Sequence, residues 1–198
     1  MKSYSTADVA RLIALTPPQV RAYARAGFLR PARGPRNTYR FSFQDLVLLR
    51  AAKALRDGHA RVFSVELSEA NAEIARRIWL HADVADRVTC VVGKIGDGGR
   101  TLDALAGRGF TAGSLDFLFI DHDKSAYLSD LASIIDRGWL RRGSIVVADN
   151  VRLPGAPKYR AYMHQQQGKV WDTVEHKTHG EYQTLLPDLV LESEYLGG

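Results

Sequence analysis

The sequence has little cysteine and no long apolar run. Its 198 residues contain a single cysteine, Cys90, which excludes an internal disulfide framework. No apolar stretch approaches the roughly 20 residues that a membrane-spanning helix needs, and the start, MKSYSTADVARL, lacks the apolar segment of a secretory signal. We therefore expect a protein of the reducing cytoplasm that has no membrane partner.

Acidic residues are scarce at the N-terminal end of the chain. Residues 1–58 contain 11 Lys and Arg against 3 Asp and Glu, a net charge of +8, whereas residues 59–198 contain 16 against 19, a net charge of −3. This asymmetry predicts two modules with different partners, divided at those boundaries. A basic first module is compatible with a polyanion such as DNA, and a solvated basic surface is the alternative.

Two short helices are predicted at the start of the first module. The segment STADVARLIALT predicts a helix that is capped by Ser5 or Thr6 and has Val9, Leu12 and Ile13 on one face. A second helix is predicted after it, beginning with two prolines, because the first turn of a helix tolerates proline. Two short helices joined by a tight turn indicate a helix-turn-helix.

A hairpin rich in arginine follows the two helices. LRPARGPRNTYRFS (29–42) predicts a wing, and SFQDLVLLRAAKALRDG (42–58) predicts a last helix. Residues 4–57 thus resemble the winged helix-turn-helix of the MerR family of transcription regulators. The resemblance implies DNA contacts from the second helix and the wing, made by Arg21, Arg25, Arg36, Tyr39 and Arg40. The alternative for the wing tyrosine is that it closes a small core.

From His59 onward, predicted strands alternate with predicted helices, a pattern typical of an α/β domain with a mostly parallel sheet. The ligands of such sheets gather at the carboxyl ends of the strands. The sequence predicts strands at 60–67, 87–93, 115–121 and 143–150, helices at 68–83 and 124–140, and a closing antiparallel pair at 169–177 and 188–196.

Three of the predicted strands end in an acidic residue. These acids are Glu66, Asp121 and Asp149, and Asn150 follows the last of them. An isolated aspartate at such a place is commonly a turn former or a helix cap. The segments FIDHDK and VVADNV together, however, predict two carboxylates and a carboxamide at neighbouring strand ends. Oxygen ligands of this kind suit Mg²⁺.

Three segments carry a more specific resemblance. FIDHDKSAYLSDL, LRRGSIVVADNVRLPGAP and GEYQTLLPDLVLESEY resemble consecutive parts of the catechol O-methyltransferase family, and the resemblance runs from about residue 60 to the C-terminus. It implies a Rossmann-like sheet, S-adenosylmethionine and Mg²⁺ as cofactors, and a catechol-like acceptor. It assigns the metal to Asp121, Asp149 and Asn150, catalysis as the base to Lys124, the acceptor to Glu181 and Asn150, and the methyl donor to Glu66 and His122.

A glycine-rich turn is missing from the second module. In the family that it resembles, this turn follows the first sheet strand and cradles the methyl donor, but no such unit is visible upstream of the strand at 60–67. The loop GKIGDGG (93–99) follows a later strand and predicts an ordinary turn. We therefore expect an α/β sheet that lacks its first strand, which would lie in the middle of the sheet.

Two functions follow from these features. The first is an Mg²⁺-dependent O-methyltransferase that acts on a catechol-like diol and carries an attached DNA-binding module. The second is a catalytically incomplete transcription regulator of MerR type, whose methyltransferase half is vestigial or senses a ligand. The acceptor residues favour the first, and the missing glycine-rich turn favours the second.

Overall fold

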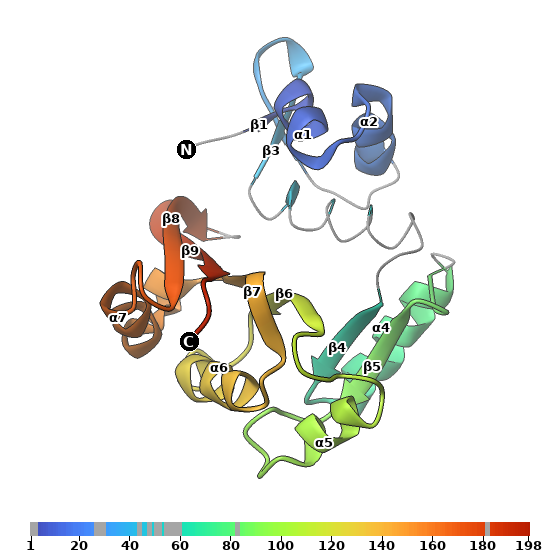
Figure 1. Cartoon of the computed structure of the whole chain (residues 1–198). Coiled ribbons are helices and arrows are strands. Elements are labelled where there is room, and N and C mark those ends of the chain that lie inside the picture. Colours follow the sequence, from blue (N-terminus) through green and yellow to red (C-terminus); the bar gives the residue numbers. More distant parts are fainter. Residues whose placement is uncertain are drawn as a thin grey trace. The chain divides into compact units, whose positions relative to one another are not determined.

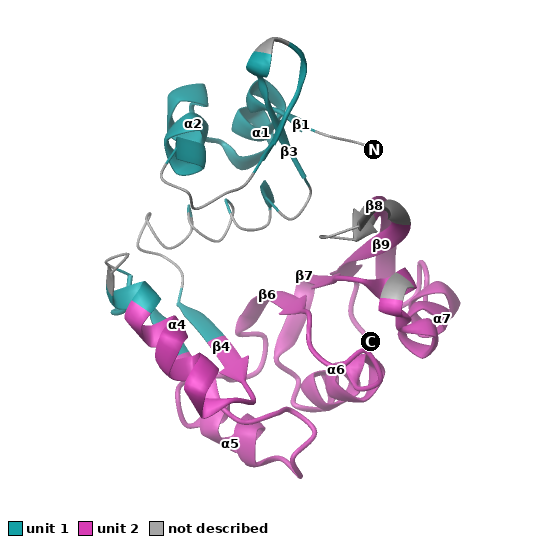
Figure 2. Ribbon diagram, turned by 180° about the vertical axis from the view of Figure 1, so that it is seen from behind, with its two compact units in different colours: residues 1–63, 78–89 teal, residues 64–77, 90–198 magenta. Residues whose placement is uncertain are grey.

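The structure of the chain is a computed structural model (Figure 1). It describes residues 4–25, 31–42, 45–46, 49, 53, 61–81, 84–180 and 183–198. The chain divides into two compact units (Figure 2): unit 1 comprises residues 1–63 and 78–89, and unit 2 comprises residues 64–77 and 90–198. No described helix is long and apolar enough to cross a membrane.

Unit 1 begins with a pair of helices whose starts match the sequence prediction. Helix α1 spans Thr6–Ile13 and helix α2 spans Pro17–Arg25. A capping box starts α1, because the Ser5 hydroxyl accepts the Asp8 backbone N–H while the Asp8 carboxylate accepts the Ser5 N–H. Helix α1 ends at Ala14 in the left-handed conformation, which turns the chain toward α2.

A small antiparallel sheet accompanies the two helices. Its strands β1 (Tyr4–Ser5), β2 (Ala32–Arg33) and β3 (Tyr39–Phe41) are arranged in the order β1-β3-β2. A short 3-10 helix, η1 (Pro35–Asn37), lies between β2 and β3. Its C-cap residue Thr38 accepts the Gly34 N–H at its carbonyl oxygen, which closes the connection between the two strands.

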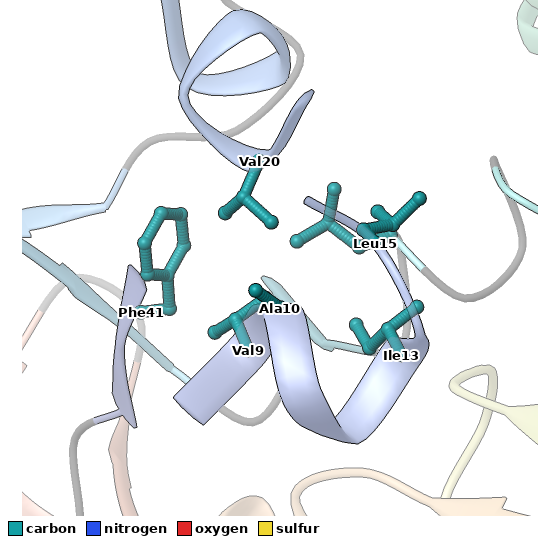
Figure 3. Close-up of a cluster of buried hydrophobic side chains, with 7 residues drawn as sticks. Val9, Ala10, Ile13, Leu15, Val20 and Phe41 are labelled. Atoms are coloured by element: carbon teal, nitrogen blue, oxygen red, sulfur yellow. The ribbon is translucent and has the colours of Figure 1, made fainter. Parts of the chain in front are cut away.

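The core of unit 1 is formed by apolar side chains from both helices, the turn between them, β3 and Leu49 (Figure 3). Its buried members are Val9, Ala10, Ile13, Leu15, Val20, Phe41 and Leu49. One predicted core residue is wrong: Leu12 is 58% exposed, because the face of α1 that packs is the one with Val9, Ala10 and Ile13. Tyr39 is partly buried and packs against this core, and its predicted DNA contact stays a prediction.

Most of the last helix predicted for the first module, 42–58, lies outside the described residues. Its start is described: the Ser42 N–H donates to the Asp45 carboxylate at 2.7 Å, and the Asp45 N–H donates to the Ser42 hydroxyl at 3.1 Å. This reciprocal pair is a second capping box. The described residue Leu49 contributes a buried side chain to the core of unit 1.

Strands β4 (Val62–Glu66) and β5 (Val88–Val92) form a two-stranded sheet, and α4 (Glu69–His81) connects them. The Val62 N–H donates to the Arg87 carbonyl and the Gly93 N–H donates to the Glu66 carbonyl. Because pairing advances in the same direction along both strands, β4 and β5 are parallel. These three elements match the strand, helix and strand predicted at 60–67, 68–83 and 87–93.

The larger sheet of unit 2 has four strands in the order β6-β7-β9-β8. Their bounds are β6 Leu115–Ile120, β7 Leu140–Ala148, β8 Trp171–Gly180 and β9 Gln183–Tyr195. Strands β6 and β7 are parallel, whereas β9 is antiparallel to both β7 and β8. The closing antiparallel pair predicted from the sequence is therefore confirmed.

Among the described residues, unit 2 contains most of α4 and four further helical segments. They are α5 (Arg100–Ala106), α6 (Tyr127–Asp136), α7 (Pro157–Gln165) and the π-helical turn η2 (Val151–Gly155). Of these four segments, the sequence predicted only α6. Helices α6 and α7 contact each other, and α7 also contacts η2 and β8. Tyr127 of α6 and Tyr159 of α7 form an edge-to-face aromatic pair with ring centroids 5.7 Å apart.

The two sheets are separate in the part of the chain that the structure describes, since no hydrogen-bonded pairing joins β4-β5 to β6-β7-β9-β8. Strand β6 is the terminal strand of the larger sheet, and its Phe117 and Phe119 are 37% and 39% exposed. A strand inside a sheet normally buries such residues. The absence of a middle strand, which the sequence predicts, would produce this division.

Candidate functional site

The ends of β6 and β7 bring two predicted site residues together. In their parallel pairing Ile120 lies opposite Ala148, and the Asp149 N–H donates to the Ile120 carbonyl at 3.1 Å. Asp121 and Asp149 are the next residues on each strand. They therefore lie side by side just beyond the same edge of the sheet, as the prediction of neighbouring strand ends requires.

Lys124 connects this pair to helix α6. Its Nζ donates to Asp121 Oδ1 at 2.9 Å and to the Tyr127 hydroxyl at 2.6 Å, and it lies 4.9 Å from the centre of the Tyr127 ring. The Tyr127 hydroxyl in turn donates to the Asp149 backbone carbonyl at 3.0 Å. A chain of hydrogen bonds thus runs from one strand end to the other through Lys124 and Tyr127.

Tyr127 is a site residue that the sequence reasoning missed. It is fully buried, and burial together with the carboxylates of Asp121 and Asp149 raises the pKa of its hydroxyl above the ordinary value. The hydroxyl therefore stays protonated and can donate to the Asp149 carbonyl while accepting from Lys124. The available signal was spacing, because Tyr127 follows Lys124 by three residues at the start of a helix.

Asp149 is the most perturbed acid of the site. It is 7% exposed, and burial raises its pKa to about 6, with smaller contributions in the same direction from Asp121 and Asp188. The N–H of Asn150 and the charge of Lys124 act in the opposite direction. A buried carboxylate beside other carboxylates favours a bound cation. The site therefore has the electrostatics of a cation site.

The atoms available to a cation are oxygens. Across residues 4–198, apart from those the structure does not describe, no three His, Cys, Asp or Glu side chains are grouped to hold a metal ion. Asp121 and Asp149 supply two carboxylates, so a third protein ligand would have to be the amide oxygen of Asn150. Two carboxylates and an amide fit a hard, oxygen-preferring cation that retains several water ligands.

Asn150 is held at both its backbone and its side chain. It adopts the left-handed conformation with φ 51°, and its N–H donates to Asp149 Oδ1 at 2.8 Å. Its side-chain Nδ2 donates to Asp188 Oδ2 at 2.8 Å. Asparagine adopts this conformation more readily than most residues. Asp188, on β9, is a second residue that the sequence reasoning missed.

His122 also contacts Tyr127. The two rings are tilted, with centroids 5.2 Å apart, and His122 Nε2 lies 2.9 Å from Asp130 Oδ2. Asp130 is buried on α6, and burial raises its pKa whereas His122 lowers it. The contact fixes the orientation of the imidazole ring. Asp130 is the third residue that the sequence reasoning missed.

Two further residues, Glu66 and Glu181, were predicted to bind the methyl donor and the acceptor. Glu66 ends β4, and its Oε1 accepts the Ser68 N–H at 2.9 Å. Its assigned role toward the methyl donor stays a prediction. Glu181, predicted to bind the acceptor, lies outside the described residues.

The predicted DNA contacts lie in unit 1. Arg21 and Arg25 are exposed and four residues apart on α2, so they share one face of that helix. Tyr39 and Arg40 are half-buried on β3, and the guanidinium of Arg33 lies 4.0 Å from the centre of the Tyr39 ring. The side chain of Arg36 lies outside the described residues. Two exposed arginines on one helix face are compatible with a DNA surface.

Comparisons with known families match two parts of the chain. Residues 41–168 match the family model described as O-methyltransferase. Residues 4–60 match the model described as MerR HTH family regulatory protein. The two matches share residues 41–60, so the segment predicted as the last helix of the first module is common to both.

Curated relatives are methyltransferases. A probable O-methyltransferase of Mycobacterium tuberculosis is 74% identical over 149 residues, which are 75% of this chain and 63% of that protein. The catechol O-methyltransferase of Sus scrofa is 38% identical over 104 residues, which are 52% of this chain and 54% of that protein. The chain thus spans somewhat more than half the length of these relatives.

Solved structures share the fold. The O-methyltransferase from Bacillus cereus, solved in complex with SAH, aligns with a TM-score of 0.56 and 22% identity over 69% of this chain and 63% of that chain. The O-methyltransferase TomG from Streptomyces achromogenes, solved in complex with SAM, aligns with a TM-score of 0.57 and 22% identity over 97% and 88%. At this identity the likeness concerns the α/β Rossmann-like fold alone.

Proposed function

The chain belongs to the O-methyltransferase family, and we propose that it transfers a methyl group from S-adenosylmethionine to one hydroxyl of a catechol-like diol, with Mg²⁺ as cofactor. The observation that carries the proposal is the joined set of Asp121, Lys124 and Asp149 at the ends of β6 and β7. The catechol O-methyltransferases among its relatives support the acceptor class.

The metal would be held by Asp121, Asp149 and the amide oxygen of Asn150. A bound Mg²⁺ supplies positive charge next to the acceptor, which favours loss of a hydroxyl proton. The raised pKa of Asp149 supports this assignment, because a cation would offset the cost of burying its charge, which is the main cause of the shift, and the smaller repulsion from Asp121.

Lys124 would act as the base. Its Nζ would accept the proton of the acceptor hydroxyl, and the hydroxyl oxygen would then bond to the methyl carbon of S-adenosylmethionine as the sulfur–carbon bond breaks. Before this step Lys124 would release a proton to solvent, and its contacts with Asp121 and the Tyr127 hydroxyl would hold the nitrogen in place to accept the proton of the acceptor. A positioned base contributes roughly 10²–10⁴-fold to rate.

The methyl donor would contact Glu66 and His122. The carboxylate of Glu66 can accept hydrogen bonds from ribose hydroxyls, and the ring of His122, fixed by Asp130, can pack against adenine. These residues come from different elements, and the sheet around β4 is separate from that around β6 in the described chain. Binding of the donor is therefore the step that tests the enzyme proposal most directly.

Titration calorimetry with S-adenosylmethionine is the first experiment. We expect heat of binding with Mg²⁺ present, and transfer of a labelled methyl group to catechol that Lys124→Met lowers by roughly 10²-fold or more. Asp136→Asn, an exposed change on α6, serves as control and should leave both unchanged. Absence of heat at millimolar donor would exclude the enzyme proposal.

A second function is favoured by the match of residues 4–60 to the MerR family: binding of duplex DNA through unit 1, by a regulator whose methyltransferase half is incomplete. Arg21 and Arg25 on α2 and Arg36, Tyr39 and Arg40 on and before β3 would contact the duplex. The net charge of +8 in residues 1–58 supports it, because phosphate contacts supply most of the nonspecific affinity for DNA.

Fluorescence anisotropy with a labelled duplex tests the second function. Affinity should fall steeply between about 50 and 200 mM salt. Arg21→Ala and Arg25→Ala should each lower the salt slope by about 1 if the arginine contacts phosphate. Arg142→Ala, an exposed change on β7, is the control. Undetectable or salt-independent binding would exclude DNA as the partner.

A further inference from the structure

Asp188 is a buried carboxylate of β9 that lies next to the segment after β7. It is 1% exposed. Its Oδ2 accepts a hydrogen bond from the side-chain nitrogen of Asn150 at 2.8 Å. Its Oδ1 accepts hydrogen bonds from the backbone N–H of Arg152 at 3.1 Å and from the backbone N–H of Leu189 at 2.7 Å. A carboxylate buried to this extent is tolerated because these donors replace water.

Strand pairing explains why Asp188 is at this place. Strands β7 and β9 are antiparallel, with Ala148 opposite Leu191. Continuing the same pairing by three residues brings Asp188 opposite position 151, just past the end of β7. Asp188 therefore meets the segment that carries Asn150, although the two residues are 38 positions apart in the sequence.

The chemistry of the contact decides which end of the Asn150 amide faces β9. An ionised carboxylate only accepts hydrogen bonds, so its partner must be the amide nitrogen and not the amide oxygen. The Nδ2 atom is therefore committed to Asp188, and Oδ1 is the end of the amide that remains to bind a ligand. The two ends of an amide differ little in size and shape, so without Asp188 packing alone would not select one orientation.

We infer that Asp188 is a positioning residue of the metal site, which holds Asn150 by its side-chain nitrogen so that the amide oxygen is presented to the cation. The inference rests on the proposed Mg²⁺ site. Asp188 itself need not touch the metal or the acceptor. Residues that orient a metal ligand in this way typically contribute 10- to 100-fold to metal affinity.

Metal binding by the full-length chain tests the inference without methyl donor or turnover. The probe is Mn²⁺, titrated against the protein and followed by the loss of the free-ion signal in electron paramagnetic resonance. We expect Asp188→Asn to weaken Mn²⁺ binding 10- to 100-fold relative to the unmodified chain. The exposed change Asp136→Asn is the control and should leave the affinity within about twofold.

A double-mutant cycle separates positioning from a general effect of charge or stability. If Asp188 acts through Asn150, Asp188→Asn should have almost no further effect once Asn150→Ala has removed the amide. Asp188→Glu keeps the charge but moves the acceptor by one methylene group, so it should also lose affinity. Asp188→Glu replaces Asp188→Asn as the test variant if the circular dichroism spectrum of Asp188→Asn differs from that of the unmodified chain.

Three results would overturn the inference. Unchanged affinity in Asp188→Asn and Asp188→Glu would exclude a role in the site. An equal loss in the presence and absence of the Asn150 amide would assign the effect to charge or stability. No binding of Mn²⁺ by the unmodified chain would remove the proposed metal itself, which distinguishes failure of the proposed function from failure of the positioning role.

Discussion

Replacing Asp149 by asparagine should stabilise the metal-free protein near neutral pH. Burial raises the pKa of this carboxyl group from 3.8 to about 6 in the folded chain. One pKa unit corresponds to about 1.4 kcal/mol, so ionised Asp149 destabilises the fold by about 3 kcal/mol. Because the residue is only 7% exposed, solvent screens little of this cost. Asparagine keeps an oxygen that can accept the Asn150 N–H and carries no charge.

The sign of the pH dependence follows from proton linkage. The folded chain holds the Asp149 proton more tightly than the unfolded chain, so this carboxyl group lowers stability as pH rises from 3.8 to about 6. The difference in unfolding free energy between Asp149→Asn and the unmodified chain should thus be near zero below that window and reach about 3 kcal/mol above it.

Urea unfolding in the presence of a chelator measures this difference. The buried tryptophans Trp139 and Trp171 report the unfolding of unit 2 by fluorescence. Asp136→Asn, on the exposed side of α6, controls for the loss of one negative charge. A variant Asp149→Asn that is no more stable than the unmodified chain above the window, or whose advantage grows on acidification, would show that burial does not raise the pKa of Asp149. Saturating Mg²⁺ should stabilise the unmodified chain and not the variant.

Three further predictions concern contacts within each unit, and each is measured as a change in the free energy of unfolding in urea. Ile13→Ala should cost about 2–4 kcal/mol because the side chain is buried, whereas Leu12→Ala on the same helix should stay within about 0.5 kcal/mol; equal effects would contradict the observed face. Tyr127→Phe should cost about 1–3 kcal/mol, since a buried carbonyl loses its donor, and no loss would argue against that hydrogen bond. Arg160→Ala should lower the free energy of unfolding by less than about 1 kcal/mol near neutral pH and should not change it in acid. Arg160 lowers the pKa of Glu175, so the stabilisation by this ion pair is lost as pH falls through the pKa of Glu175 in the folded chain. A loss of stability that persists in acid would indicate that Arg160 acts by packing instead.

The sequence predicted the elements whose signal is local. The capping residue Ser5 and the antiparallel pair β8 and β9 follow from patterns within a few residues, and the structure agrees with both. The short helix α5 was missed, because it follows a glycine-rich loop and spans only Arg100–Ala106, too short for a clear apolar period. Leu12 was misplaced, because an eight-residue helix allows more than one apolar face.

In the candidate site too, residues marked by a local pattern were predicted, whereas residues defined by a distant strand pairing were not. Asp121 and Asp149 could be placed together because parallel strands end at a common edge. Asp188 could not, because its contact with Asn150 depends on the pairing of β9 with β7, which no local pattern specifies. Residues that touch a ligand are recognised by their type, whereas residues that orient them are recognised only by their partners.

Metal binding and donor binding should be separable in this chain. The described contacts that form the proposed metal site come from β6, β7, β9, α6 or the residues that follow these strands, and β7 pairs with both β6 and β9 in the larger sheet. The residue assigned to the ribose, Glu66, belongs to the β4-β5 sheet, which no described pairing connects to β6. Loss of a middle strand would therefore weaken donor binding before it affects the metal. A chain that binds Mn²⁺ but not S-adenosylmethionine would fit a retained acceptor site in an incomplete enzyme, whereas one that binds S-adenosylmethionine alone would contradict this division.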